Sequence, residues 1–534
     1  MQRLSILLLS FLAIALVGCK DQPSSPPTHT VPPTTAAPAD PAPEQSPAAA
    51  AEPVNWVLDR FEGVPCWHQS PESPGATLHP RVSREGSLIR VRGEPMAFDL
   101  TEETVEEGVR KLEAHSPAGA CLRLDPIQLC HDKIAQALQG LPYERITLTL
   151  TQRDRDAMEW GKCLQRIGGR GLYLHIEKGT ASTLKELVHA PNLLGLDLSK
   201  AVLSDRDTAP LTTLTRLHNL NLSHTQVGRE TVERLAGMKG LASLNLTSTR
   251  ITDSSISLLN SLSSLHNLKI SGNKISTKGF LALDLPNLRH LAAAATSITA
   301  SALKSLRRMP ELQTLNLSMT PLGDGALPQI AQLVHLRTLH LNGTQVSDDG
   351  MPLLLSLTEL ETLHLADTRV GDKGLESVGK LTHLKRLYLW HTKITDAGLR
   401  HLGGLSQLRV LHLANNAVGQ AALMFLDSDS QLQELWLSHT RLSGQHLLTR
   451  RPSLKLELLA LSGLPIGDEF IVELLPYVPN LRVLLLNKTE VSEDLIPYLV
   501  KLRFLQLLTV RGSRFTGPGV SILKMEMRGL EIRR

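Results

Sequence analysis

Imidazole and aromatic side chains recur at one regular spacing in the C-terminal half of the chain. His340, His364, Tyr388, His412 and Trp436 stand 24 residues apart, each between the two leucines of a Leu-x-Leu triplet. Three more side chains of these kinds lie two or three residues beyond such a position: Trp390, His391 and His439. The chain has only 8 Phe, 5 Trp and 5 Tyr, so this grouping marks a candidate ligand-binding site. Rigid rings offer a large contact area at low entropic cost, and His supplies adaptable hydrogen bonds.

The same side chains admit other interpretations. Stacked rings could serve only to stabilise the surface of a sheet. His340, His364 and His412 could reach one metal ion from adjacent strands, but no acidic ligand clearly completes the set, although Asp367 is near. General-base chemistry would need a nucleophile or paired carboxylates, and no convincing arrangement accompanies the histidines. The motifs G-x-S-x-G, G-x-x-x-x-G-K-[ST] and H-E-x-x-H do not occur. We therefore expect no catalytic residue, no metal, no cofactor and no enzymatic activity.

The 24-residue spacing extends far beyond these side chains. Small or polar residues, mostly Thr, follow the first leucine of each triplet by five residues, and an aliphatic residue such as Val346 or Ile394 follows by seven. Degenerate copies extend upstream to Leu172, Leu148 and Leu122, and we expect a last strand at 530–532. The first leucines of the regular triplets are Leu196, Leu220, Leu244, Leu268, Leu291, Leu315, Leu339, Leu363, Leu387, Leu411, Leu435, Leu459, Leu484 and Leu508.

The clearest copy of the unit is LKRLYLWHTKITDAGLRHLGGL, residues 384–405. This pattern resembles the leucine-rich-repeat family, and the resemblance covers roughly three quarters of the chain. It implies an α/β fold, a right-handed solenoid or horseshoe with parallel strands on the concave face and short helices on the convex face. It also implies protein partners most often. Thr frequently stands where many family members have Asn, which Asn273 and Asn416 retain, and we expect the Thr hydroxyl to bond the backbone of the turn instead.

Strand geometry explains how such repeats would position the rings. The two leucines of Leu-x-Leu point inward, so the residue between them points into the concave hollow. Strands stacked about 4.8 Å apart would spread the five rings over roughly 19 Å. The middle residues Asn221, Asn245 and Asn316 could extend this surface or simply form a solvated face.

Acidic residues and glycines recur on the other side of the repeat. Asp residues such as Asp348, Asp372 and Asp396 precede the second apolar segment, where each can accept hydrogen bonds from the first free amides of a short convex helix. Gly350, Gly374 and Gly398 lie within those first turns, and the sequence alone provides no firm reason for them.

The N-terminus carries the features of an export signal. Arg3 precedes an apolar run, Leu4 to Val17, that is short for a transmembrane helix. Its ending, Leu16-Val17-Gly18-Cys19, resembles the lipobox of bacterial lipoproteins. The resemblance implies a signal peptide over 1–18, lipidation of Cys19, and a location in the cell envelope (the outer membrane in a Gram-negative cell, because Lys20 follows). The alternative is an ordinary secretory signal with a chance cysteine.

Three regions follow the expected signal peptide. Residues 19–53 contain the lipidated cysteine and a Pro/Ala-rich tether, which could reach up to about 100 Å. Residues 54–120 form an N-terminal capping region, with a strand at Leu88–Val91 and a helix from Thr101 to His115, and residues 121–534 form the solenoid. Four further cysteines suggest disulfides in an oxidising compartment, with pairing undetermined and free thiols as the alternative: Cys66, Cys121, Cys130 and Cys163.

Charge and organisation together favour a binding module. The formal net charge is +4, and no basic stripe with interleaved aromatics suggests nucleic acid. We expect a membrane-anchored protein whose concave face binds a protein partner. The alternatives are a protein that binds cell-wall or surface glycan, and a structural spacer without a specific ligand.

Overall fold

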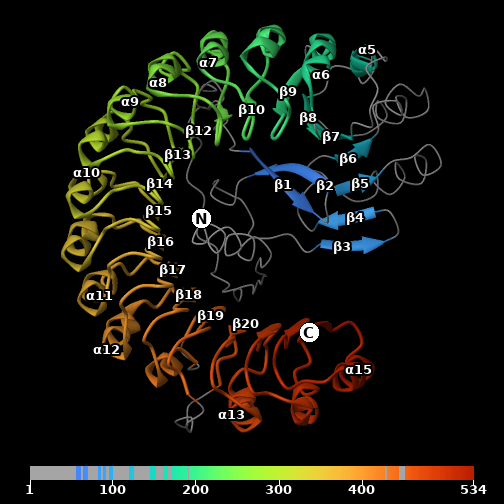
Figure 1. Cartoon of the computed structure of the whole chain (residues 1–534), viewed down its shortest axis with the longest axis vertical. Helices are drawn as coiled ribbons and strands as arrows, with labels where there is room; N and C mark the ends of the chain where they lie inside the picture. Colours follow the sequence, from blue (N-terminus) through green and yellow to red (C-terminus); the bar gives the residue numbers. More distant parts are fainter. Residues whose placement is uncertain are drawn as a thin grey trace, which may run out of the picture. The chain divides into compact units, whose positions relative to one another are not determined.

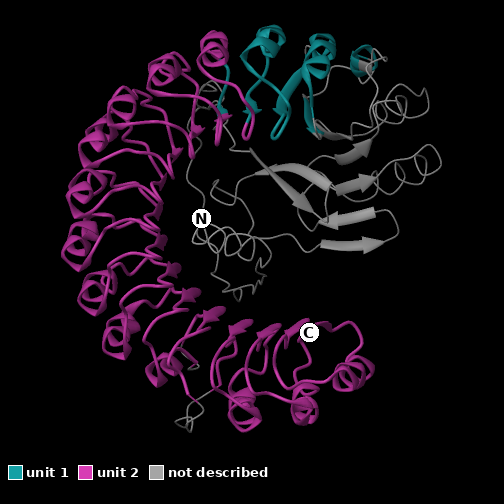
Figure 2. Cartoon of the chain, in the orientation of Figure 1, with its two compact units in different colours: residues 1–222, 240–243 teal, residues 223–239, 244–534 magenta. Residues whose placement is uncertain are grey.

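The computed structural model describes residues 192–426, 430–443 and 452–534, together with shorter segments upstream (160–165, 171–177 and 179–190) and the backbone of seven strands between residues 56 and 151. These residues fall into two compact units (Figure 2). Unit 1 comprises residues 1–222 and 240–243, and unit 2 comprises residues 223–239 and 244–534. Within the described residues, no helix combines the length and the apolar composition needed to cross a membrane.

Unit 1 begins with antiparallel pairs and continues as a parallel sheet. The pair β1 (Trp56–Phe61) and β2 (Val64–Gln69) is antiparallel, as are β3 (Val82–Glu85), β4 (Leu88–Val91) and β5 (Met96–Asp99). The parallel strands are β6 (Ala120–Leu124), β7 (Arg145–Thr151), β8 (Gly171–Glu177), β9 (Leu193–Asp197) and β10 (Asn219–Asn221), with helices α5 (Trp160–Gln165) and α6 (Ala181–Glu186). The strand expected at Leu88–Val91 and the degenerate upstream copies are thereby confirmed.

Several expectations lie outside the described residues. These are the signal peptide, Cys19, the tether and the helix from Thr101 to His115, which all stay predictions. The disulfides stay a prediction as well, because Cys163 is the only one of the four cysteines whose side chain is described.

Unit 2 is a stack of parallel strands whose helices lie on the outer side (Figure 1). The strands are β11 (Ser243–Asn245, whose first residue is assigned to unit 1), β12 (Asn267–Lys269), β13 (His290–Ala292), β14 (Thr314–Asn316), β15 (Thr338–His340), β16 (Thr362–His364), β17 (Arg386–Tyr388), β18 (Val410–His412), β19 (Glu434–Trp436), β20 (Leu458–Ala460), β21 (Val483–Leu485), β22 (Leu507–Thr509) and β23 (Glu531–Arg533). The first leucine of each triplet pairs with the next, as Leu339 does with Leu363. β23 overlaps the last strand expected at 530–532 but lies one residue later, so the prediction is confirmed apart from its bounds.

The outer elements of unit 2 are short. The α-helices are α7 (Arg229–Leu235), α8 (Asp253–Leu259), α9 (Thr277–Leu281), α10 (Leu327–Ile330), α11 (Asp372–Val378), α12 (Asp396–Leu399), α13 (Asp468–Leu474), α14 (Ile496–Leu499) and α15 (Gly517–Glu526). Several repeats have 3-10 turns there instead, such as η4 (Ala300–Arg308), η5 (Asp324–Ala326) and η6 (Asp348–Ser356). The leucines of the triplets, such as Leu363 and Leu365, are fully buried, so the core runs between the strand layer and the helix layer.

The residue four positions after the first leucine of each triplet adopts the left-handed backbone conformation. Its φ is +54° at His391 and +56° at His439, and Gly343 and Gly463 occupy the same position in other repeats. The next residue then ties the turn to the strand. The hydroxyl of Thr368 donates to the Leu365 carbonyl (2.6 Å), which confirms the role expected for Thr. Asn416 does more, because its amide also donates to the Leu389 carbonyl of the preceding repeat (2.7 Å).

The repeated Asp residues bond to the start of the helix in the following repeat rather than to their own helix. Asp372, the first residue of α11, instead accepts hydrogen bonds from the backbone N–H (2.8 Å) and hydroxyl (2.6 Å) of Thr395, the residue before α12 in the next repeat. Asp324 binds Ser347 in the same way, at 2.8 Å and 2.6 Å. The expectation that Asp accepts an early amide of a short helix is confirmed at Asp348, whose carboxylate accepts the N–H of Gly374 in the first turn of α11 (2.9 Å). The Asp residues therefore link adjacent repeats.

This link explains the glycines inside the first helical turns. A methyl group added at Gly374 would lie 2.6 Å from the Asp348 carboxylate and 3.0 Å from a Val370 methyl. One added at Gly398 would collide with the Asp372 carboxylate. The glycine thus leaves room for the carboxylate of the preceding repeat, a requirement of space rather than of backbone conformation.

Candidate binding site

Five consecutive strands of unit 2 end in the predicted ring residues. His340, His364, Tyr388, His412 and Trp436 are the last residues of β15 to β19, and we call these five side chains the ring ladder. Parallel pairing in register places each directly beside the next. All five are half-buried on the strand side. The structure therefore brings these five predicted site residues into one row.

The rings of the ladder stack on one another. The centroids of His340 and His364 lie 4.0 Å apart, as do those of His364 and Tyr388, with interplanar angles of 22° and 7°. Tyr388 and His412 are tilted by 35° at 6.4 Å, and His412 stacks on Trp436 at 5.2 Å and 12°. Stacking uses the ring faces, so the hydrogen-bonding groups of these side chains lie on the ring edges.

Neighbouring side chains hold the ladder in place. The Trp436 indole N–H donates to Glu434, a largely buried carboxylate on the same strand, at 3.2 Å. The Arg386 Nε donates to the Thr362 hydroxyl at 3.0 Å, and these two residues lie two positions before Tyr388 and His364 on their strands. These bonds bind side chains on the same face of the sheet and limit the freedom of the rings.

Two of the ladder histidines, His364 and His412, are neutral at pH 7 because burial lowers the pKa of each. Burial lowers the pKa of His412 to about 4. Burial also holds the pKa of His364 well below its usual range, and His340 and Arg386 lower it further by repulsion. Neutral imidazoles can stack face to face and can each donate one hydrogen bond and accept another.

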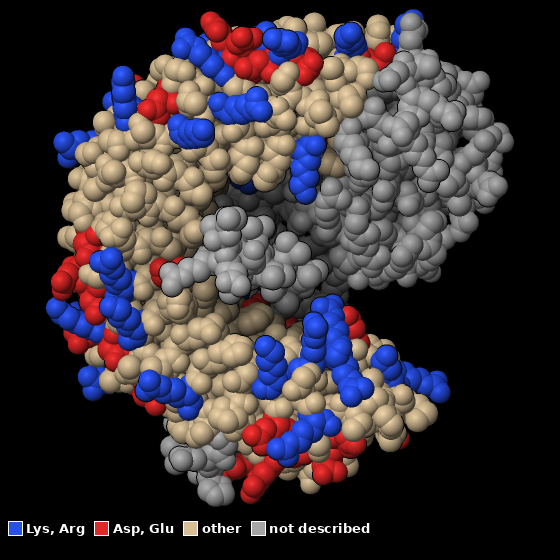
Figure 3. Space-filling model, viewed as in Figure 1, with Lys and Arg blue, Asp and Glu red and all other residues tan. Residues whose placement is uncertain are grey.

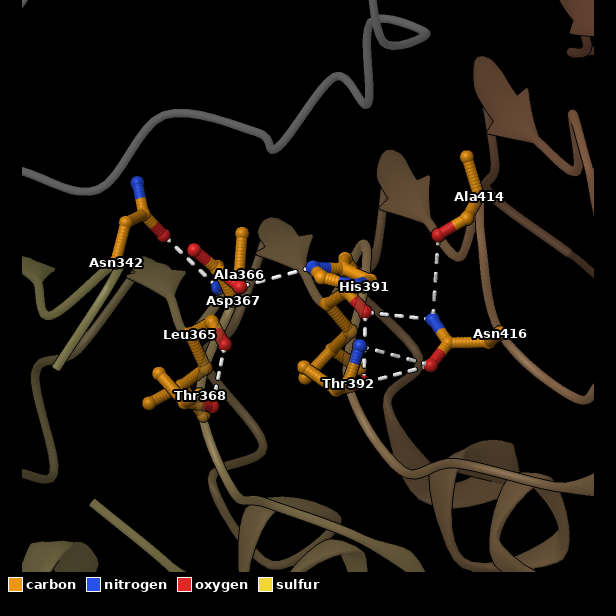
Figure 4. A network of polar contacts seen from close by, with 10 residues as sticks. Asn342, Leu365, Ala366, Asp367, Thr368, His391, Thr392, Ala414 and Asn416 are labelled. Atoms are coloured by element: carbon orange, nitrogen blue, oxygen red, sulfur yellow. Dashed lines mark hydrogen bonds and ion pairs between the residues drawn. The ribbon is translucent and has the colours of Figure 1, made fainter. Parts of the chain in front are cut away.

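The other three predicted residues form a separate group in the turns beyond the strands. The Trp390 and His391 rings lie 6.3 Å apart at 18°. His391 is largely exposed, and its Nδ1 lies 2.8 Å from the Asp367 carboxylate at the same position of the preceding repeat (Figure 4). The His439 ring lies against Gly463, where any side chain would collide with it. No ring contact joins this turn group to the ladder among the residues the structure describes.

The geometry does not support a metal site in the ladder. The lone pairs of imidazole nitrogens lie in the ring plane, so parallel stacked rings cannot point them at one ion. Tyr388 also separates His364 from His412 in the row. In the described part of the chain, no group of three His, Cys, Asp or Glu residues is placed to hold a metal.

The Asn residues of the middle position serve the backbone. The side-chain carbonyls of Asn245 and Asn316 each accept the N–H two residues on, Thr247 and Ser318, at 3.0 Å. Asn221 instead donates to Asp197, both within unit 1, at 2.9 Å. These contacts favour a structural role for the Asn residues over an extension of the binding surface.

Sequence reasoning missed the left-handed turn and the Asp367–His391 contact within it. Glycine at 272, 343, 463 and 512 was the available signal, because a position that repeatedly tolerates glycine often requires positive φ. That position puts Asp367 and His391 on neighbouring turns.

Comparison with known proteins agrees with this architecture. Residues 332–354, 356–379 and 380–403 match the family model described as Leucine Rich repeat, so these segments are leucine-rich repeats. Proteins with such repeats are typically non-enzymatic binding scaffolds. A search of the curated proteins finds no match to the sequence.

Similar solved structures include an internalin from Listeria monocytogenes, with 23% identity over 61% of this chain and 82% of that one (TM-score 0.40). A leucine-rich-repeat protein from Leptospira interrogans has 20% identity over 82% of this chain and 99% of that one (TM-score 0.46). The plant peptide hormone receptor RGFR1, solved in complex with RGF2, has 15% identity over 82% of this chain and 87% of that one (TM-score 0.37).

Proposed function

We propose that this chain is a membrane-anchored, non-enzymatic protein that binds a protein partner through the strand side of unit 2. The ring ladder would be the centre of the contact, and the turn group of Trp390, His391 and His439 would be its margin. The observation that carries the proposal is the row of five stacked, half-buried rings on adjacent strands. Clustered aromatic side chains held in one conformation are typical of the residues that dominate protein interfaces.

Other repeats indicate that the rings are not needed for the fold. The same middle position holds Lys269, Ala292, Ala460 and Thr509 in strands that pair in the same register. A repeat therefore forms with or without a ring there. Five consecutive rings then require another explanation, which a ligand supplies.

The stacking favours a protein over a glycan. Sugars bind aromatic residues by lying on an open ring face, but the faces within the ladder are covered by neighbouring rings at 4.0 to 6.4 Å. The ring edges, with imidazole nitrogens and the Tyr388 hydroxyl, suit peptide groups and polar side chains. Glycan binding remains an outcome that the experiment below distinguishes, as does a spacer with no ligand.

The anchor is a separate part of the proposal. Cys19 would carry the lipid, residues 20–53 would form the tether, and the protein would lie in the cell envelope, at the outer membrane in a Gram-negative cell. Disulfides among the four remaining cysteines would strengthen the N-terminal region there. Metabolic labelling with a fatty acid tests the anchor, because Cys19→Ala should abolish incorporation, and unchanged incorporation would contradict it.

A pull-down tests the binding site. Purified chain would be mixed separately with fractionated envelope proteins and with cell-wall glycans. The test variant combines His364→Ala, Tyr388→Ala and Trp436→Ala, and the control combines Val334→Ala and Leu353→Ala, two exposed side chains elsewhere in unit 2. We expect a protein to bind the wild type and the control but not the test variant. Capture from the glycan pool alone, or equal capture by all three proteins, would overturn the proposal.

A further inference from the structure

Residues at equivalent positions of different repeats can be compared in the segment that leads from each outer helix to the next strand. Seven and four residues before the first leucine of the triplet, repeats in the middle of unit 2 carry polar or small residues. Examples are Ser261 with Ser264, Gln332 with His335, and Lys380 with His383. These positions face solvent in an ordinary repeat, so polar residues are expected there.

The last two repeats depart from this pattern. The same two positions hold Lys501 and Phe504 in one repeat and Met525 and Arg528 in the next. Phe504 is 53% exposed and Met525 is 71% exposed. Large apolar side chains thus replace polar ones while remaining in contact with water.

Two further apolar residues complete the set. Tyr498 and Ile522, ten residues before their triplets, are 38% and 45% exposed. We call the six side chains the terminal array: Tyr498, Lys501, Phe504, Ile522, Met525 and Arg528. The members pair at intervals of 24 residues, which is the interval that separates the paired residues of β22 and β23, so equivalent positions occupy neighbouring repeats.

The terminal array combines apolar and basic side chains. The Lys501 ammonium lies 5.1 Å from the centre of the Tyr498 ring, where cation–π attraction holds it beside an apolar neighbour. Arg503 and Lys524 are exposed next to array members in the sequence. Arg503, Lys524 and Arg528 form no ion pair within the described part of the chain, so their charges remain available.

The core does not account for these apolar side chains. The ten-residue helix α15 buries only Gly519 and Leu523, which leaves Ile522 and Met525 outside. Exposed apolar groups of this size lower solubility unless a partner covers them.

Charge identifies the kind of partner. Residues 481–534 contain ten Lys and Arg against five Asp and Glu, a net charge of +5, whereas the whole chain carries +4. The first 480 residues therefore sum to −1, and the entire positive excess lies in this end of unit 2. Figure 3 shows Lys and Arg side chains gathered there, in the lower part of the view.

We propose that the terminal array docks on the surface of an anionic lipid bilayer. Apolar and aromatic side chains interleaved with Lys and Arg are the pattern that binds the interface between lipid headgroups and acyl chains. A bilayer also accepts separate apolar side chains on an outer surface, whereas a protein partner needs a matching shape. The contact is independent of Cys19 and of the ring ladder.

Hydrogen exchange on the full chain tests the docking. Every protein would carry Cys19→Ala, so that no attached lipid contributes. Phosphatidylcholine vesicles with and without phosphatidylglycerol would be added, and amide exchange would be followed in residues 496–530. The array variants are Phe504→Ser with Met525→Ser, and Lys501→Glu with Arg528→Glu. The matched controls are Val334→Ser with Leu353→Ser, and Lys278→Glu with Lys304→Glu, which alter exposed residues of other repeats.

We expect exchange in residues 496–530 to slow only with phosphatidylglycerol, and the effect to weaken at high salt. Either array variant should lower the apparent vesicle affinity about tenfold or more, and the controls should not. Unchanged thermal unfolding would show that the variants fold. No slowing in the wild type, equal slowing in the array variants, or slowing by an acidic protein but not by vesicles would each overturn the proposal.

Discussion

The strand side and the helix side of unit 2 use repetition for different purposes. On the helix side, Asp372 binds Thr395 of the next repeat and Gly398 leaves room for that carboxylate, so each residue is explained by a neighbour in the chain. On the strand side, the middle position of the triplet holds Ala, Lys, Thr or a ring without a change of register. A repeated residue that the neighbouring repeat requires is structural, whereas a run of residues that no neighbour requires points to a ligand.

The largest loss of stability should come from filling the space beside the Asp carboxylate. Gly398→Ala would collide with Asp372 and should lower the free energy of unfolding by about 2–4 kcal/mol, measured by urea denaturation. Gly325→Ala, where nothing lies within 4 Å, is the matched control and should be neutral or slightly stabilising. Equal losses at both sites would show that the carboxylate does not explain the glycine.

Removing a side chain that bonds two repeats should cost more than removing one that bonds only its own turn. Asn416→Ala should lower the free energy of unfolding by about 2–3 kcal/mol, because it removes the bonds to the Leu389 and Leu413 carbonyls and the acceptor of the Thr392 N–H. Thr368→Val, which loses one bond to Leu365, should cost about 1 kcal/mol. The same urea experiment measures both, and the reverse order would contradict the account.

Acid should weaken the ring ladder. The pKa of His412 falls to about 4 in the folded chain, against about 6.5 for an unperturbed imidazole, so the unfolded chain binds more protons between these values. Stability should therefore decrease as the pH falls from about 6.5 to about 4, and the lowered pKa of His364 adds in the same direction. We expect a loss on the order of 1–3 kcal/mol, reduced by partial exposure of the rings.

Substitution can show whether the ladder histidines, rather than other titratable groups, cause the loss of stability in acid. His364→Phe with His412→Phe keeps two flat rings but removes the titration, so the melting temperature should depend less on pH in this window. His383→Phe alters an exposed ring that forms no ion pair among the described residues, and this control should leave the dependence unchanged. A double variant with the wild-type pH dependence would place the acid sensitivity elsewhere.

The positions of the buried leucines and of the ring ladder could be predicted from the sequence, whereas the contacts of the repeated Asp and Gly residues could not. Successive side chains of a strand point to opposite faces, and equivalent strands lie 24 residues apart in the sequence. The inward leucines and the row of rings therefore follow directly from the sequence. The partner of Asp372 could not be predicted in this way, because Thr395 lies 23 residues further along and comes near only when the coil closes. The sequence also did not predict that the candidate site divides into the ring ladder and a separate turn group, because the left-handed turn separates His391 and His439 from the ladder.

The central claim is that the ring ladder serves binding more than folding, and one matched pair of measurements tests it most directly. The affinity of the isolated protein partner and the free energy of unfolding would be measured for the wild type and for the variant carrying His364→Ala, Tyr388→Ala and Trp436→Ala. The account predicts that affinity falls by about a hundredfold or more, while the three substitutions together cost no more than about 2–3 kcal/mol of stability. Unchanged affinity with a larger loss of stability would contradict it, and would make the ladder a device that stiffens the sheet.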